Sequence, residues 1–94
     1  MQLKLGDTLL GTLVVDGGDM PWWYGHFQPT VEFTPARPLF DEWSRAVEES
    51  DEAAMIAADQ ALEAMDLVIT GAGDGEPLTE FLLYIDDDRF RLRY

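Results

Sequence analysis

The only histidine of the chain, His26, is the side chain best suited to acid–base chemistry, because histidine titrates near neutral pH. No serine or threonine adjoins it in a nucleophile motif, and Ser44 and Ser50 fall on or between expected helices. A contact with Asp16 or Asp19 would depend on the fold. We therefore expect a structural histidine, and we assign no catalytic residue.

Aromatic side chains surround this histidine. The segment between Met20 and Phe27 (residues 20–27) holds two of the three tryptophans. Its proline and the glycines around it exclude an ordinary amphipathic helix, so we expect an ordered loop. Tryptophan and tyrosine are enriched at binding hot spots. The candidate binding residues in this aromatic loop are Trp22, Trp23, Tyr24, His26 and Phe27.

Two interpretations of the aromatic loop remain open. Single rings could fold back over an open end of the core, which is the ordinary use of such side chains. A core this small does not easily bury all of them, so we expect some to stay partly exposed as an apolar patch with polar tips. Such a patch suits a protein interface or a flat ligand, and a homodimer would be the commonest way to use it.

Half of the six basic residues alternate near the C-terminus, at Arg89, Arg91 and Arg93. Alternation along a strand puts all three on one side, so we add them to the candidate binding residues. They could receive an anion or an acidic partner surface. They could instead pair within the sheet, which is the interpretation we favour. The internal partners would be Asp86, Glu80 and the ring of Tyr84.

Two further segments resemble ligand sites only superficially. Asp86, Asp87 and Asp88 could bind a hard cation, but they lack the spacing of a calcium loop, and a polar turn explains them. The glycine-rich residues 71–75 lack the lysine of a phosphate-binding loop, so we expect a flexible connector. We expect no metal and no cofactor.

Composition narrows the class of protein. The 94 residues suit a single small globular domain (residues 1–94), and the absence of cysteine excludes disulfides and thiolate chemistry. The net charge of −13 repels nucleic acids and anionic lipids, so we expect neither partner. The sequence shows no secretory signal and no membrane span, and we expect a cytoplasmic protein.

The elements that must position these residues begin with two strands. Leu3 and Leu5 alternate before a Gly-Asp pair, and residues 9–15 are rich in leucine and β-branched side chains. The second strand should end at a turn of residues 16–18.

Two helices follow. Thr34 offers an N-cap with proline next to it, and Ser50 should cap the second, alanine-rich helix. The short link between them predicts an antiparallel pair. The first helix carries an apolar stripe at helical spacing, formed by Leu39, Phe40, Trp43, Ala46 and Val47.

The C-terminal part predicts a buried strand over residues 67–69 and then a hairpin. If Asp87 and Asp88 form the turn, Asp86 lies opposite Arg89. A slip of one residue would put arginines against the core, so the pattern supports this register. The apolar face of the hairpin then consists of Phe81, Leu83, Ile85, Phe90, Leu92 and Tyr94.

Together these elements predict an α+β fold: an antiparallel sheet of four to five strands, with the helix pair packed on one face (order β-β-loop-α-α-β-β-β). Trp43 and Val47 should contact the apolar face of the hairpin.

The residues match no motif of a family known to us, so the functional hypotheses stay broad. The leading one is a small acidic interaction module that uses the aromatic loop, as a homodimer or with another protein. A more specific version is an immunity-type inhibitor that neutralises a basic partner with acidic side chains of the first helix. The alternative class is a small-ligand binding protein or an enzyme with a pocket under the aromatic loop, although we do not expect an enzyme. The helix carboxylates in question are Asp41, Glu42, Glu48 and Glu49.

Overall fold

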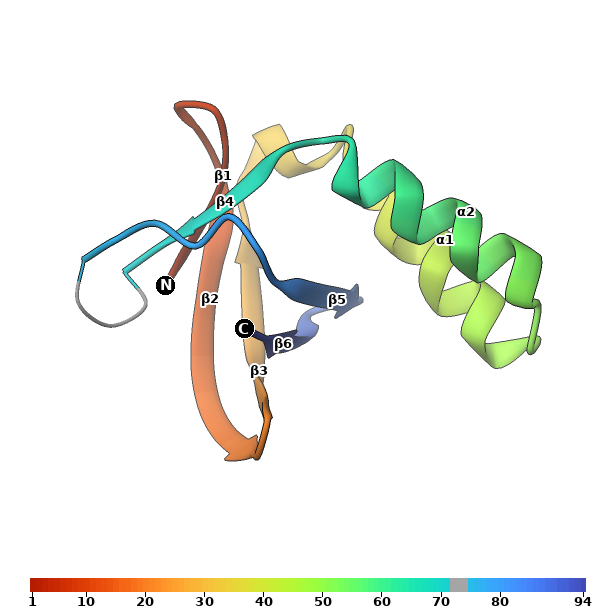
Figure 1. Cartoon of the computed structure of the whole chain (residues 1–94). Coiled ribbons are helices and arrows are strands. Elements are labelled where there is room, and N and C mark those ends of the chain that lie inside the picture. The colour runs from red at the N-terminus through yellow and green to blue at the C-terminus, as the bar shows by residue number, and fades with distance from the viewer. Residues whose placement is uncertain (72–74) are drawn as a thin grey trace.

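The computed structural model describes residues 1–71 and 75–94. Figure 1 shows a curled antiparallel sheet from which a pair of helices projects. The strands are β1 (Gln2–Leu5), β2 (Thr8–Asp19), β3 (Trp22–Pro29), β4 (Leu67–Thr70), β5 (Leu82–Asp86) and β6 (Arg89–Arg93). A short 3-10 helix, η1 (Val31–Phe33), precedes helices α1 (Arg37–Glu48) and α2 (Glu52–Glu63). The predicted α+β class is confirmed, with six strands in the sheet rather than four to five.

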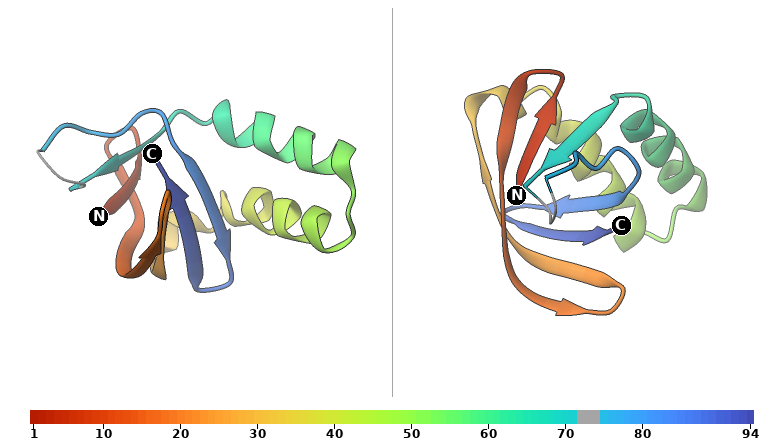
Figure 2. Two further views of the ribbon diagram at one scale, coloured as in Figure 1. Left: turned by 60° about the horizontal axis from the view of Figure 1, so that its bottom comes forward. Right: turned by 60° about the vertical axis from the view of Figure 1, so that its left-hand side comes forward.

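The strands lie in the order β4-β1-β2-β3-β6-β5. Strand β6 pairs with β3 on one side and with β5 on the other, so the C-terminal hairpin extends the central β2–β3 hairpin. The sheet is strongly curled (Figure 2). Its inner face therefore encloses the core, while its outer face points away from the core.

A row of aromatic rings ties the sheet to the helices. Phe27 of β3 meets Phe33 of η1 edge to face, with ring centroids 4.7 Å apart. Phe33 in turn meets Phe40 of α1 at 5.5 Å. All three rings are at most 2% exposed. They belong to a core that includes Leu3, Leu10, Leu13, Leu67, Ile69, Leu83, Ile85, Phe90 and Leu92.

The predicted aromatic loop is wrong, because residues 22–29 form strand β3. Gly25 suggested a break, but it permits a close approach of two strands: a Cβ atom there would lie 1.9 Å from the carbonyl oxygen of Val14. The predicted turn at residues 16–18 is also wrong. Strand β2 continues to Asp19, with a β-bulge between Val15 and Gly17.

The position of the helix pair also differs from the prediction. Helix α1 packs against the edge strand β5 instead of lying flat on one face. Because it lies along an edge, it reaches both sides of the sheet. Phe40 enters the core, whereas Trp43 stacks on Tyr84 of the outer face, with centroids 3.8 Å apart. Val47 is 41% exposed and does not belong to the core.

The helix boundaries shift by a few residues. Helix α1 begins at Arg37, three residues after the predicted cap Thr34. Helix α2 is capped by Asp51, whose carboxylate accepts a hydrogen bond of 3.1 Å from the backbone N–H of Ala54. The predicted cap, Ser50, instead has a positive φ of 54°. In the described part of the chain, no helix has both the length and the apolar character needed to cross a membrane.

The C-terminal hairpin agrees with the predicted register. Asp86 pairs with Arg89 across a two-residue turn, and Asp87 takes the positive φ of 57° that such turns favour. The predicted strand over residues 67–69 is confirmed as β4. The predicted connector, residues 71–75, falls mostly on residues 72–74, which lie outside the described residues.

Candidate functional site

The outer face of the sheet collects most of the predicted binding residues. Side chains alternate along a strand, so Trp22, Tyr24 and His26 of β3 all lie on the face opposite the core residue Phe27. The three arginines of β6 share that face, since β6 pairs with β3. Two segments that are far apart in the sequence thus become neighbours. The rows across β3, β6 and β5 are Trp22-Arg93-Leu82, Tyr24-Arg91-Tyr84 and His26-Arg89-Asp86.

We call this surface the aromatic–arginine face and define it by Trp22, Tyr24, His26, Tyr84, Arg89, Arg91 and Arg93. Two predicted binding residues lie on the other side of β3. Phe27 is buried in the core, and Trp23 is partly buried against it. Both side chains pack on the core side of β3, opposite the aromatic–arginine face.

Stacked rings and one arginine form the centre of the face. Tyr84 lies between Trp43, which stacks on it at 3.8 Å, and Trp22, whose ring centroid is 5.9 Å away. The Cζ atom of Arg91 lies 5.3 Å from the Trp22 ring and 5.8 Å from the Tyr84 ring. The predicted pairing of an arginine with Tyr84 is therefore confirmed for Arg91. Cation–π contacts of this kind hold the guanidinium in place while leaving its N–H donors for other groups.

The ring of Tyr24 fits on the face because its neighbour on β2 is a glycine. A Cβ atom on Gly17, its neighbour on β2, would lie 2.6 Å from the Tyr24 ring. The glycine therefore makes room for the ring to lie across the strand. Tyr24 remains 37% exposed, which leaves it accessible to a partner.

The bulge in β2 supplies the acidic member of the site. One carboxylate oxygen of Asp16, Oδ2, lies 2.9 Å from Nδ1 of His26 and 3.1 Å from Nη1 of Arg89. The fold thus provides the contact between His26 and Asp16 that the sequence leaves open. Arg89 pairs with Asp16 here, whereas the sequence suggested Asp86. These side chains are exposed, so water screens the pairs, and their main effect is to fix the orientation of His26 and Arg89.

A groove of about 400 Å³ borders the face on the side of α1. Trp43, Ser44, Val47 and Glu48 of the helix form one wall, and the strands form the other. The Ser44 hydroxyl donates a 3.5 Å hydrogen bond to the carbonyl of edge strand β5 at residue 85. The helix therefore stands beside the sheet and creates the concavity. The strand residues that line the groove are Tyr24, Tyr84, Asp86, Arg89, Phe90 and Arg91.

The surroundings of Tyr84 favour its neutral phenol. Burial raises the pKa of its phenol, the nearby carboxylate of Asp59 raises it further, and Arg91 partly offsets this rise. The hydroxyl therefore stays protonated at ordinary pH and can donate or accept a hydrogen bond. In the same stack, the indole N–H of Trp43 is buried, and among the described residues it has no hydrogen-bond partner.

Sequence reasoning missed Trp43 as part of the site and named Asp16 only as a fold-dependent contact of His26. Trp43 sat in the apolar stripe of a helix, and such a stripe normally faces a core. Asp16 was assigned to a turn because it precedes two glycines. Only the alternation along β5 pointed to Tyr84, by placing it among the polar side chains of the hairpin.

In residues 1–71 and 75–94, no group of three or more histidine, aspartate or glutamate side chains is arranged to hold a metal ion.

Comparison with models of known protein families, with curated proteins and with solved structures finds no match for this chain.

Proposed function

We propose that the protein is a small binding module that contacts a partner protein through the aromatic–arginine face. The observation that carries this proposal is the gathering of Trp22, Tyr24 and Tyr84 with three arginines on one face of three neighbouring strands. Tryptophan, tyrosine and arginine are the residues most enriched at binding hot spots. Strands and stacked rings hold these side chains before any partner arrives, which lowers the entropy cost of binding.

The chemistry of the face indicates what would bind it. Trp22 and Tyr24 offer flat apolar surface next to the guanidinium of Arg91. A partner segment with an apolar or aromatic side chain flanked by carboxylate or carbonyl oxygens would satisfy both. The partner is either another protein or a second copy of this chain, and we propose the cytoplasm as the location.

The first test asks whether the face joins two copies. Sedimentation equilibrium of the wild type beside Trp22→Ala measures the association, and circular dichroism confirms that the variant folds. A wild-type dimer that becomes a folded monomer in the variant would identify the partner as a second copy. A dimer that is unchanged in the variant would place the self-association elsewhere.

The second test locates a foreign partner. A photo-reactive benzoylphenylalanine replaces Tyr24 in one variant and Ile56 in a control, because Ile56 is 59% exposed on α2, away from the face. We expect one cross-linked protein from position 24 that is missing from position 56, and we expect Trp22→Ala to weaken its binding at least tenfold, the loss of a typical hot spot. Equal cross-linking at both positions would contradict the proposal.

The groove beside α1 favours a second candidate, the binding of a small molecule. Its volume of about 400 Å³ lies within the roughly 300–1,000 Å³ common for ligand sites. The aromatic segment belongs to the sheet and does not roof this pocket, so the site differs from the one predicted under an aromatic loop. Val47→Trp would fill the groove and leave Trp22 free. Loss of a co-purifying small molecule, measured by native mass spectrometry, with retained partner binding would favour this candidate.

A further inference from the structure

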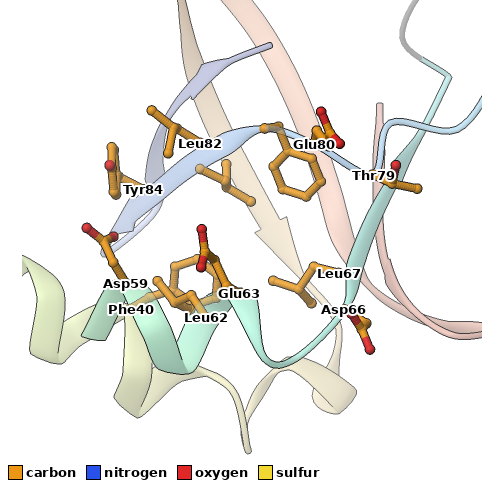
Figure 3. A pocket seen from close by; sticks show the side chains of 12 residues that line it. Phe40, Asp59, Leu62, Glu63, Asp66, Leu67, Thr79, Glu80, Leu82 and Tyr84 are labelled. Carbon is orange, nitrogen blue, oxygen red and sulfur yellow. The ribbon is translucent and has the colours of Figure 1, made fainter. Parts of the chain in front are cut away.

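A second concavity lies between α2 and β5 and shares one lining residue, Tyr84, with the groove beside Trp43. It is bounded by the second half of α2, by β5 and by the segment that leads into β5, and its volume is about 410 Å³. Figure 3 shows the side chains that line it. The floor is apolar and consists of Phe40, Leu62, Leu67, Phe81 and Leu83. Phe40, Leu67 and Leu83 also belong to the buried core, so the floor is a fixed part of the fold.

The rim of this groove is acidic. Asp59 and Glu63 are one turn apart on α2 and therefore share a face of the helix. In Figure 3 they reach from α2 toward β5, and Glu80 lies across the groove on the segment that leads into β5. Asp66 completes the set, and none of the described lysine or arginine side chains lines the groove.

Several carboxylates outside the groove form ion pairs with arginine. Arg45 pairs with Glu42 of α1 and with Glu49 just after that helix, and Arg89 pairs with Asp16 on the outer face. Within the part of the chain that the structure describes, none of the four carboxylates around the groove has an ion-pair partner. Like charges held around an apolar floor repel one another, and a cation from outside would relieve that repulsion.

The combination of surfaces matches one kind of side chain. Lysine and arginine lay an aliphatic stem along apolar surface and keep a cationic head at its polar edge. The groove offers that order of surfaces: the floor for the stem and the rim for the head. The rings of Phe81 and Tyr84 add two aromatic groups to the lining. Burial raises the pKa of Tyr84, the nearby carboxylate of Asp59 raises it further, and Arg91 partly offsets the rise, so one carboxylate of the rim acts on this ring.

We propose that this groove binds a basic segment of a partner protein, with a lysine or arginine stem on the apolar floor and its cationic head among Asp59, Glu63 and Glu80. The net charge of −13 would speed the encounter with such a partner. The predicted neutralisation of a basic partner would thereby use α2 and not the carboxylates of α1, two of which Arg45 already occupies. This surface shares only Tyr84 with the aromatic–arginine face, and the proposal does not depend on that face.

The probe is a short acetylated and amidated peptide in which lysine alternates with leucine. It is titrated into isotope-labelled protein and followed by two-dimensional amide NMR. We expect the largest shift changes around Asp59, Glu63 and Phe81. The same peptide with glutamate in place of lysine should cause none. Shift changes spread over the whole acidic surface, or centred on Trp22, would overturn the proposal.

Two double variants separate the groove from general charge attraction. Asp59→Asn with Glu63→Gln removes two charges from the rim, and Glu32→Gln with Asp41→Asn removes two exposed charges elsewhere. We expect the first to weaken peptide binding about fivefold or more and the second by less than about twofold. Equal weakening by both would mean that the peptide senses only the net charge.

A third experiment tests whether the apolar floor contributes to binding. A peptide with 2,4-diaminobutyrate in place of lysine keeps each ammonium group but shortens its stem by two methylenes. We expect binding to weaken by about threefold or more, because part of the floor stays uncovered. Unchanged affinity would show that the floor takes no part and would overturn the assigned pose. Trp22→Ala should bind the lysine peptide like the wild type, which keeps this test independent of the proposed function.

Discussion

Phe40→Ala should separate the helix pair from the sheet more effectively than any change in the exposed part of α1. Phe40 is the residue through which α1 enters the core, and only 2% of it is exposed. Its ring contacts that of Phe33, which in turn contacts Phe27. Removing the ring therefore interrupts the aromatic row that joins α1, η1 and β3.

The expected cost follows from burial. A buried phenylalanine replaced by alanine costs about 3–5 kcal/mol, which combines the lost transfer free energy with the cavity that remains. For 94 residues, a free energy of unfolding of about 5–14 kcal/mol is typical. Phe40→Ala should thus remove a large fraction of the stability. It should lower Tm by about 15 °C or more, at roughly 4–8 °C per kcal/mol for a chain of this size.

Val47→Ala is the matched control on the same helix. Val47 keeps 41% of its surface exposed, so burial loses only about 1 kcal/mol. Alanine also has the higher helix propensity, by about 0.5 kcal/mol, and the net cost should be about 0.5 kcal/mol.

Urea unfolding followed by circular dichroism measures both variants against the wild type. Fits with a common slope would show that the comparison concerns stability and not the compactness of the unfolded state. The sequence pattern alone placed Val47 in the inward stripe and would predict a substantial loss there too. A loss at Val47 equal to that at Phe40 would refute the edge-on position of α1.

Three further outcomes can be checked with the same unfolding assay. Trp22→Ala should lower the free energy of unfolding by about 1–2 kcal/mol, because it removes one aromatic pair and one cation–π contact. Trp23→Ala should lower it by about 3 kcal/mol, because it uncovers the core. The reverse order would contradict the assignment of the two faces. Asp51→Ala should cost about 1 kcal/mol because the N–H of Ala54 loses its acceptor, and Asp51→Asn should restore most of it; no loss in the alanine variant would count against this cap. Because the pKa of Tyr84 is raised in the folded protein, its neutral phenol stabilises the fold fully below the unfolded tyrosine pKa of about 10. This contribution is lost as the pH rises through the pKa of the folded state. Phenolate absorbance should show one tyrosine titrating late, and Tyr84→Phe should remove that phase; a late phase that survives would assign it to another tyrosine.

Local patterns predicted the C-terminal hairpin well. Leu83 and Phe90 alternate with Tyr84 and Arg91, and only one register keeps the arginines out of the core. A side-chain period of two leaves little freedom once one face is apolar, which is why this pairing could be derived without a structure.

The central hairpin could not be predicted in the same way. Gly17 and Gly25 looked like breaks, because glycine more often marks a turn than a strand interior. Here Gly25 permits the close approach of β2 and β3, and Gly17 makes room for the ring of Tyr24. Both reasons involve atoms of a neighbouring strand, which the sequence does not display.

By itself, the sequence determined the α+β class, the C-terminal register, the antiparallel helices and the charge of −13, because each depends on composition or on contacts between residues close along the chain. Only the tertiary structure decided that β3 lies beside β6, so that Trp22 and Tyr24 share a face with the arginines. It also placed α1 at an edge and left an acidic groove under α2. Strand order and helix position are decided by which buried faces fit together across long separations in sequence, and no local pattern records that fit.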